Sequence, residues 1–407
     1  MRLTKVCRQL VGVEGLYAQS VSVEASGLVF RVRPRWRKPR CGGCGRRAPG
    51  YDRRPMRRWR HIPVGETVVW LEYAPWRVRC PYCGVTVEQL PWARHASRFT
   101  RGLEELTAHL ARSLDFTAIT ELLGLSWRAV ASIVERVVTQ RLPTSRLSGL
   151  RRIGVDEFSY RKRHRYLTVV VDHDQGQVVW AARGRGSQAL AGLFEHLGES
   201  GCAAIESVTM DMAGGYKKAV REHLPHAQIV FDRFHVQRLA SDAVDKVRRS
   251  EVRGTDNPAM ARVIKRSRYA LLKNPWNMSR RENQKLADIQ HNNQRLYRAR
   301  LLNDALADAL SYRQPKRARQ ALDEWLEWAS RSKLKPFVRV ARTIREHKDG
   351  ILAYIKSRLT NGFTEGLNNR LRTVARRAYG FHSAEALMSM LFLCAGGIEL
   401  NPPLPTH

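Results

Sequence analysis

Two pairs of cysteines place the tightest constraint on how this chain of 407 residues can fold. Cys41-Gly-Gly-Cys44 and Cys80-Pro-Tyr-Cys83 are separated by 35 residues. Two thiolates on one tight turn can grip one metal ion, and two such turns complete a tetrahedral four-sulfur site. A redox-active pair would instead occur singly, beside a βαβ pattern. We therefore predict that all four cysteines bind a structural Zn²⁺ and hold residues 1–98 together as a zinc-ribbon-like module.

The charge balance indicates a polyanionic partner. Lys and Arg total 71 against 37 Asp and Glu, which gives a formal net charge of +34. Such an excess repels itself unless a polyanion is near, and nucleic acid is the abundant polyanion of a cell. A ribosome-associated or membrane-surface protein would share this excess. The cations are spread through folded-looking segments rather than gathered in a tail, which favours a broad surface for double-stranded DNA.

Three further features bear on the compartment. Seven cysteines with two Cys-x-x-Cys pairs suit thiols that a reducing cytosol keeps free. No stretch reaches the roughly 18 consecutive apolar residues of a membrane span. The N-terminus lacks the apolar core and cleavage site of a secretion signal. We therefore expect a cytoplasmic, nucleoid-associated bacterial protein that contacts no membrane.

A basic cluster lies between the two cysteine pairs. The planar guanidinium fork of arginine suits phosphate, because it can donate two parallel hydrogen bonds. A solvated loop is the alternative interpretation of the same residues. The arginines that we predict to contact DNA phosphates here surround Trp59 and are Arg53, Arg54, Arg57, Arg58 and Arg60.

Residues 99–145 change to a helical pattern. Leucines recur at helical spacing near its start, Gly124 breaks the pattern, and Ser126 can cap the helix that follows. Two short helices joined by a glycine-containing turn are typical of a helix-turn-helix, although any helical hairpin shares the pattern. Given the charge, we predict a DNA-binding helix-turn-helix in which Arg128 contacts DNA.

Residues 150–240 hold short apolar runs, several of which end in an acid. Three runs joined by tight turns and then strand–helix–strand units indicate a mixed sheet with helices packed on it. Residues 241–355 are helical in period, so we expect an all-helical insertion, followed by a final segment over 356–400. The expected strands cover 153–156, 166–171, 178–182, 208–211 and 229–232.

Acids at the ends of adjacent strands are the pattern that phosphodiester chemistry requires. Two divalent cations about 4 Å apart can activate an attacking oxygen and stabilise a leaving one, and they need several carboxylates at one point. Asp156, Asp172, Asp211 and Asp232 each end a predicted strand. Such acids are also common as caps and turn residues, so each alone is a weak signal.

A later helix adds one more acid. Glu365 lies where Thr364 can cap a helix that has an apolar stripe on one side. Its polar side carries Asn369, Arg372 and Arg376, which we predict to contact DNA. An ordinary amphipathic helix with a solvated arginine face is the alternative.

Together these motifs resemble those of the transposases of the ISL-three family of bacterial insertion sequences, over nearly the whole chain. Besides the cysteine pairs and the helix-turn-helix, the matching segments are Ile153-Gly-Val-Asp-Glu-Phe158 with His164-Arg-Tyr166, Val208-Thr-Met-Asp-Met212 with Tyr216, Phe231-Asp-Arg-Phe-His-Val236 and Asn361-Gly-Phe-Thr-Glu-Gly-Leu-Asn-Asn369.

The resemblance implies a multidomain α/β protein whose ribonuclease-H-like catalytic domain, residues 150–240 and 356–400, is interrupted by the helical insertion. It also implies that Asp156, Asp211 and Glu365 bind two Mg²⁺ (or Mn²⁺) ions. Asp232 and His235 stand in a motif typical of the family, and we assign them a supporting role. Asp232 is the main rival to Asp211 as the second acid.

The expected function is that of a DDE transposase. It would bind the terminal inverted repeats of an insertion sequence, cleave the DNA, and transfer the strand to target DNA as a homodimer or higher oligomer. One alternative is a catalytically inactive zinc and helix-turn-helix regulator. A nuclease that only cuts is another, and a serine or tyrosine recombinase with a covalent DNA link is a third.

Overall fold

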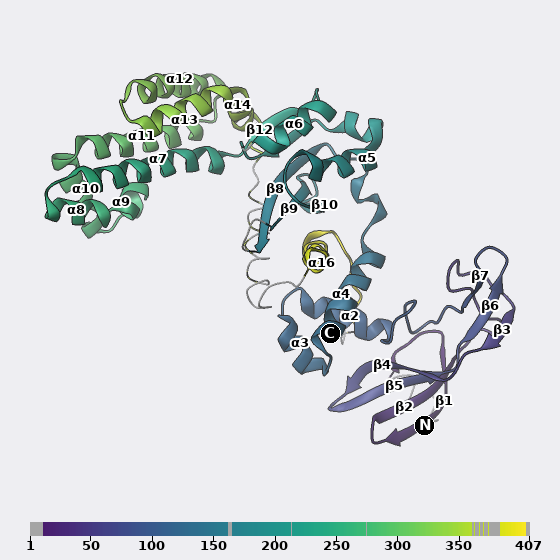
Figure 1. Ribbon diagram of the computed structural model, residues 1–407. Coiled ribbons are helices and arrows are strands. Elements are labelled where there is room, and N and C mark those ends of the chain that lie inside the picture. The colour runs from purple at the N-terminus through teal and green to yellow at the C-terminus, as the bar shows by residue number, and fades with distance from the viewer. Residues whose placement is uncertain are drawn as a thin grey trace. The chain divides into compact units, whose positions relative to one another are not determined.

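The computed structural model describes residues 11–161, 165–212, 214–273, 275–359 and 383–403, and four single residues between 360 and 382. Contacts divide the chain into two compact units. The first comprises Met1–Pro143 with Leu371–His407, and the second is Thr144–Arg370 (Figure 1). Among the predicted site residues, Glu365, Arg372 and Arg376 lie outside the described residues.

The first unit begins with a four-stranded sheet in the order β1-β2-β5-β4. The pairs β1/β2 and β4/β5 are antiparallel, whereas β2 and β5 run parallel. Its core is aromatic: Trp59 and Trp92 meet edge to face with ring centroids 5.9 Å apart, and Leu71 is fully buried. The strands are β1 (Leu16–Glu24), β2 (Gly27–Pro34), β4 (Arg57–Val64) and β5 (Thr67–Tyr73).

A smaller antiparallel sheet, in the order β3-β6-β7, carries the cysteines. Cys80 ends β6, and Cys41 forms an isolated bridge with Glu88 just beyond β7. Both cysteine pairs therefore lie at one end of this sheet. The strands are β3 (Gly50–Arg53), β6 (Trp76–Cys80) and β7 (Gly84–Val87).

Three helices follow, and their side-chain caps come from the residues that the local pattern favours. The side chains of Thr100, Asp115 and Ser126 each accept a hydrogen bond from a backbone N–H in the first turn of α2, α3 and α4. Gly124 ends α3 in the left-handed region at φ 57°. The axes of α3 and α4 differ by 105°, within the range typical of a helix-turn-helix. The helices are α2 (Arg101–Ala111), α3 (Phe116–Leu123) and α4 (Trp127–Arg141).

Helix α16 (Ala384–Ala395) packs against α4 in the first unit. The guanidinium of Arg112 donates to the backbone oxygens of Leu393 (3.1 Å from Nε) and Ile398. This differs from the sequence prediction, which put all of 356–400 in the catalytic domain. An apolar helix must be buried, but its own pattern does not say which neighbour buries it.

The second unit is built on a five-stranded sheet in the order β10-β9-β8-β11-β12. The first three strands are antiparallel neighbours, while β8, β11 and β12 run parallel. This confirms the predicted mixed sheet. Helices α5 and α6 contribute to its core together with Val155, Met210 and Phe231. The elements are β8 (Arg152–Arg161), β9 (Arg165–Asp172), β10 (Gln177–Arg183), α5 (Ser187–Ala204), β11 (Ser207–Met210), α6 (Gly214–His223) and β12 (Gln228–Phe231), after the short helix η1 (Thr144–Leu147).

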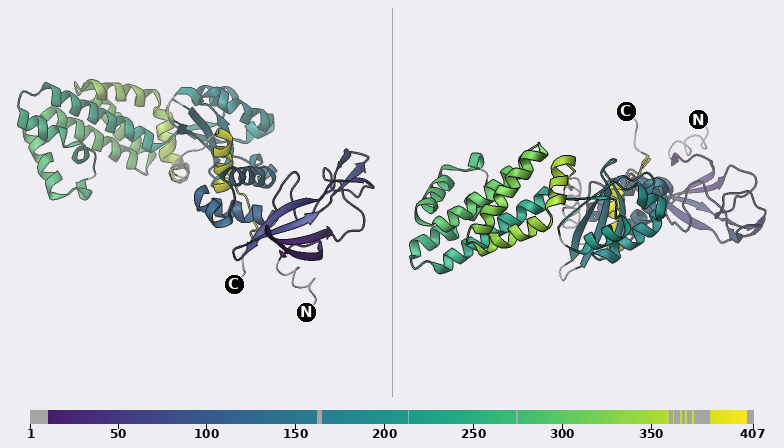
Figure 2. Two further views of the ribbon diagram at one scale, coloured as in Figure 1. Left: turned by 60° about the horizontal axis from the view of Figure 1, so that its bottom comes forward. Right: turned by 90° about the horizontal axis from the view of Figure 1, so that it is seen from above.

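Helices occupy the rest of the second unit (Figure 2), as predicted for the insertion. Helix α7 pairs with α11, and α12 and α13 extend this layer. Gly350 lets α14 approach β12, because a Cβ there would lie 2.5 Å from the Phe231 ring. The helices are α7 (Arg233–Gly254), α8 (Pro258–Lys265), α9 (Arg268–Leu272), η2 (Pro275–Asn277), α10 (Arg280–Asn292), α11 (Gln294–Ser311), α12 (Pro315–Arg331), α13 (Lys335–Glu346) and α14 (Lys348–Ser357).

Within the described ranges, no single helix is long and apolar enough to cross a membrane. The bent pair α3 and α4 passes the test of length and composition only when its two helices are taken together.

Candidate functional site

The four predicted zinc ligands come together in space. Their sulfur atoms all lie within 4.8 Å of one another, and Cys44 Sγ is 3.6 Å from Cys80 Sγ. Four sulfurs at tetrahedral corners, each about 2.3 Å from zinc, would be about 3.8 Å apart. Cys41 and Cys80 are buried, whereas Cys44 and Cys83 are exposed. Among the described residues, this is the one cluster of three or more His, Cys, Asp or Glu side chains close enough to share an ion.

The electrostatics of the cluster also fit a cation. The backbone N–H of Tyr82 donates to Cys80 and lowers the pKa of that thiol to about 7. Hydrogen bonds with Cys41 and Cys44 raise the pKa of Cys83 to about 12, because crowded sulfurs share their protons. A divalent cation removes this conflict by stabilising several thiolates at once. The residues present therefore fit the predicted zinc.

Several arginines of the predicted phosphate-binding cluster have partners within the protein. Arg57 Nη2 donates to the Ser97 backbone oxygen at 2.7 Å. Arg58 lies 3.0 Å from both Glu24 and Glu72. These contacts follow from strand alternation and cross-strand pairing, which the sequence alone could not assign.

Arg60 connects β4 to the helix-turn-helix. Its guanidinium donates to the backbone oxygens of Leu123 (2.9 Å) and Gly124 (2.8 Å), at the end of α3. A cation is favoured there, since the last carbonyls of a helix carry partial negative charge. The ring of Trp76 lies under Arg53, 4.5 Å from ring centroid to guanidinium carbon, and Arg54 is exposed. Because Arg53 also donates to the Ala74 backbone oxygen at 3.4 Å, Arg54 is the one of the five predicted contacts that is most open to a ligand.

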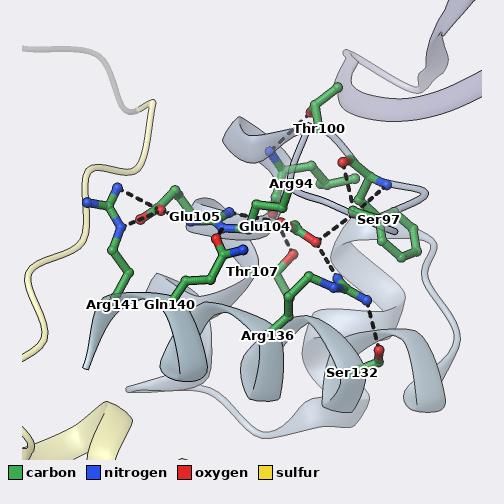
Figure 3. A network of polar contacts seen from close by, with 12 residues as sticks. Arg94, Ser97, Thr100, Glu104, Glu105, Thr107, Ser132, Arg136, Gln140 and Arg141 are labelled. Carbon is green, nitrogen blue, oxygen red and sulfur yellow. Dashed lines mark hydrogen bonds and ion pairs between the residues drawn. The ribbon is translucent and has the colours of Figure 1, made fainter. Parts of the chain in front are cut away.

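A buried network of charges ties α2 to α4 (Figure 3). Glu104 is fully buried and accepts from Arg94 (2.8 Å), Ser97 (2.7 Å) and Arg136. Neighbouring Glu105 accepts from Arg94 and from Arg141 at 2.9 Å. Buried charges persist only when they are paired and hydrogen-bonded in this way, so the network sets how α4 lies against α2.

Helix α4 presents a polar face to solvent. Its apolar side, which includes Val130, Ile133 and Val137, is buried. Arg128 lies in the first turn and is exposed, as the prediction of a DNA contact requires. The N-terminal residues of the second helix are the ones that reach base edges in helix-turn-helix proteins.

Asp156 lies within β8, and Asp211 directly follows the neighbouring strand β11. In the parallel pair β8/β11, Thr209 is opposite Gly154, so continuing the register by two residues places Asp211 opposite Asp156. Adjacent strands are about 4.8 Å apart, and side chains two apart share a face. Both carboxylates are half-buried. The sheet therefore brings Asp156 and Asp211 to one place, although 54 positions separate them in the chain.

Asp232 belongs to the same row but has a different environment. Met210 pairs with Phe231, so Asp232 follows β12 just as Asp211 follows β11. Its side chain caps α7 and accepts from the backbone N–H of Phe234 at 3.0 Å. Asp232 is only 2% exposed, and His235 lies half-buried in the same helical turn.

Two further residues near this row, Glu157 and Tyr216, were missed as site residues by sequence reasoning. Burial, followed by the charges of Asp211 and Asp156, raises the pKa of Glu157. Burial likewise raises the pKa of Tyr216, whose hydroxyl lies 2.8 Å from Thr168 Oγ1. The Asp-Glu doublet in the first strand was the available signal for Glu157.

A histidine, His173, contacts Thr209 of β11. His173 Nε2 is 2.6 Å from Thr209 Oγ1. Burial lowers the pKa of His173, and the nearby carboxylates of Asp172, Asp174 and Asp232 act against that shift.

One of the three DNA contacts that were predicted on the helix after Glu365 lies among the described residues. This residue is Asn369, and it is exposed.

Comparison with known proteins identifies the family. A family model described as a transposase matches residues 153–391, and the helix-turn-helix domain of transposase family ISL3 matches residues 88–138. The chain is 37% identical over 437 residues to the transposase for insertion sequence element IS1557 of Mycobacterium tuberculosis, which covers 100% of this chain and 98% of that protein. It is 31% identical over 362 residues to the transposase for IS1001 of Bordetella parapertussis, covering 88% and 89%.

The second family match contains α2, α3 and nearly all of α4, whose geometry is that of a helix-turn-helix. The first match spans more than half of the chain and contains the sheet with its row of acids. Both relatives align over most of their own length. The chain therefore belongs to the ISL3 family of transposases and carries that family's helix-turn-helix DNA-binding domain.

Proposed function

We propose that this transposase cuts and joins DNA strands at an acidic site made by Asp156, Asp211 and Glu365. The observation that carries the proposal is the parallel register of β8 and β11, which sets two of these acids side by side. The strand order β10-β9-β8-β11-β12 supports a ribonuclease-H-like catalytic fold, with the helices from α7 onward as its insertion.

Two Mg²⁺ or Mn²⁺ ions bound there would stabilise charge on the attacking and leaving oxygens of an in-line displacement. Asp156 and Asp211 supply the hard carboxylate oxygens that such ions prefer. Burial and then the like charges of Asp211 and Asp156 raise the pKa of Glu157, because close carboxylates disfavour each other's ionisation. We take Glu157 and Tyr216 to hold that pair of acids in place rather than to react.

Asp211, rather than Asp232, is our choice for the second acid. Asp232 already caps α7, so its carboxylate accepts a hydrogen bond from a backbone N–H in the first turn of that helix. A supporting role follows, in which Asp232 fixes the start of α7 beside the site.

The contacts with the element ends are proposed to lie on the first unit. The helix-turn-helix would read the terminal inverted repeats through α4, with Arg128 at the groove and Arg53 and Arg54 on phosphates. Zn²⁺ bound by the four cysteines would hold the N-terminal module folded. Two element ends must be held together for transposition, so we propose a homodimer or higher oligomer on DNA. The same oligomer would bind the target DNA.

The test is cleavage and joining of a labelled element end, with DNA binding measured in parallel. Asp156→Asn, Asp211→Asn and Glu365→Gln should each lower the rate about a thousandfold or more while binding persists. The reason is that several kcal/mol of transition-state stabilisation are lost. Asp242→Asn, an exposed acid on α7, is the matched control and should react like the unchanged protein.

Two outcomes would overturn the proposal. Full activity of Asp211→Asn together with an inactive Asp232→Asn would move the second acid to β12. An unchanged protein that binds the end but never cuts it, with magnesium or manganese, would favour a DNA-binding regulator.

A further inference from the structure

The outer tip of the helical insertion has an unusual local composition. The tip comprises α8, α9 and η2 with the start of α10, and Figure 1 shows these helices at the end of the insertion away from the sheet. Residues 258–281 contain no Asp or Glu. The cations of this stretch are Arg262, Lys265, Arg266, Arg268, Lys273, Arg280 and Arg281.

Five of these cations, Arg262, Lys265, Arg266, Arg280 and Arg281, form no ion pair with a described acidic side chain, and the first three lie on α8 or directly after it. Arg268 lies 3.6 Å from Asp245, and Lys273 lies 3.0 Å from Glu282. Arg262, Lys265 and Arg266 are exposed, and no described acidic side chain lies within 4.0 Å of them. A cluster of this kind repels itself and attracts a polyanion.

Two aromatic rings stand among these cations. Tyr269 is 75% exposed and Trp276 is 79% exposed, which makes them the most exposed aromatic side chains in the described ranges. Neither ring stacks on another described side chain, whereas many exposed rings of the N-terminal module lie under arginines, as Tyr82 does under Arg46. Exposed rings without internal partners are a cost unless a ligand covers them.

The backbone that carries Tyr269 is well anchored. Ile264, Ser267 and Leu271 are fully buried, and Ser267 Oγ donates to the Ile264 oxygen at 2.8 Å. The guanidinium of Arg248 donates to the Lys265 backbone oxygen at 3.2 Å, tying α8 to α7. Tyr269 therefore stands on a packed helix, and Trp276 lies in the short helix η2 that follows it.

The tip is distinct from the row of acids. Asp245, which contacts the tip, follows Asp232 by 13 residues along α7. At about 1.5 Å per residue, this places the two regions about 20 Å apart.

From this arrangement we propose that the insertion tip is a further DNA-binding surface that takes a segment with unpaired bases. Arg262, Lys265 and Arg266 hold the phosphate backbone, while Tyr269 and Trp276 stack on exposed bases. Cations beside aromatic platforms are the combination that binds single strands, because every base offers a flat face. A transposase acts on DNA, so DNA is the polyanion that this surface would meet.

The first experiment measures affinity for a fluorescent single-stranded oligonucleotide and for a fully paired duplex of equal length. The double variant Tyr269→Ala/Trp276→Ala should lose about tenfold or more in single-strand affinity and keep its duplex affinity, because base stacking is lost. Trp276→Phe should retain most of the binding, since it keeps a flat ring.

A second experiment isolates the phosphate contacts by salt dependence. The triple variant Arg262→Gln/Lys265→Gln/Arg266→Gln should lower the slope of log affinity against log salt by about 2 for single strands. Lys316→Gln/Arg317→Gln/Arg319→Gln removes the same charge from exposed positions on α12 and should leave the slope unchanged.

Unchanged single-strand affinity and salt slope in both tip variants would overturn the proposal. So would a change in the sedimentation of the DNA-free protein without a change in DNA affinity, because the surface would then meet a second copy of the chain. Thermal unfolding should match the unchanged protein. Asp156→Asn should bind single strands normally, which separates this surface from the acidic site.

Discussion

The cysteine cluster of the first unit and the row of acids of the second each bring side chains that can bind metal close together. The cluster would serve stability, and the row of acids would serve catalysis. Cys41 and Cys80 are buried at the end of a small sheet, where bound zinc would close the module. Asp156 and Asp211 are half-buried beside another acid whose pKa is raised. The first cluster should contribute stability, and the second should cost stability in return for chemistry.

The same contrast extends to the surroundings. Around α2 and α4 the buried charges pair with opposite charges, as Glu104 does with Arg94 and Arg136. Around β8 and β11 the neighbours of the acids include a further acid, Glu157. Close carboxylates disfavour each other's ionisation, whereas buried carboxylates paired with arginines do not.

The largest expected effect is on the first unit. Removing the metal with a chelator should cost about 10 kcal/mol of folding free energy in the cysteine module, as structural zinc sites do. Hydrogen exchange should show protection lost around β6 and β7 and kept in β8 and β11. Cys202→Ser is the control, since Cys202 lies outside the cluster and should leave the metal content unchanged. Equal protection with and without chelator would contradict a structural ion.

A smaller effect is expected from His61, which is buried against Thr100 with Nδ1 2.9 Å from its hydroxyl. Burial lowers the pKa of His61 from 6.5 to about 4. The unfolded chain therefore takes up the proton first, so stability is highest above pH 6.5 and falls as pH drops toward 4. The loss should reach about 3 kcal/mol, at 1.36 kcal/mol per pKa unit.

Urea unfolding at pH 7 and pH 4.5 measures this loss. His61→Gln should flatten the dependence on pH, because a glutamine takes up no proton. His95→Gln, at an exposed position, should keep the dependence of the unchanged protein. If the free energy of unfolding depended on pH in the same way in both variants, another group would cause the loss.

The smallest effect separates the two candidate second acids. Asp232→Ala should cost about 1 kcal/mol, since it removes the cap of α7. Asp211→Asn should leave the free energy of unfolding unchanged or raise it slightly, because it relieves repulsion near Asp156 and Glu157. Chemical denaturation of both variants measures the difference. Equal losses for both would remove the distinction between a capping acid and a catalytic one.

Much of the fold was predictable because its signals are local. The helix that Ser126 was expected to cap begins at the next residue, Trp127, and Gly124 breaks the preceding helix as expected. The strand expected over 208–211 is β11, Ser207–Met210. The cysteine cluster was equally readable, since each pair lies on its own short turn.

The acidic site could be predicted from the sequence only in part. The strand ends before Asp211 and Asp232 could be located from the sequence, whereas Asp156, which was expected to end its strand, lies in the middle of β8 (Arg152–Arg161). Which of them is a cap depends on the hydrogen bond from Phe234 to Asp232, and the pattern does not contain it. Glu157 was passed over because its influence depends on a neighbouring strand.

By itself, the sequence determined the zinc-type ligand set, the helix-turn-helix, the mixed sheet and the basic character of the chain. Each rests on spacing over a few residues or on composition, which folding does not alter. The tertiary structure decided that Arg58 and Arg60 serve internal contacts, that α16 packs on α4, and that Arg262, Lys265 and Arg266 form no ion pair with a described acid. A side chain's partner is set by contacts between distant segments, and only the folded chain brings those segments together.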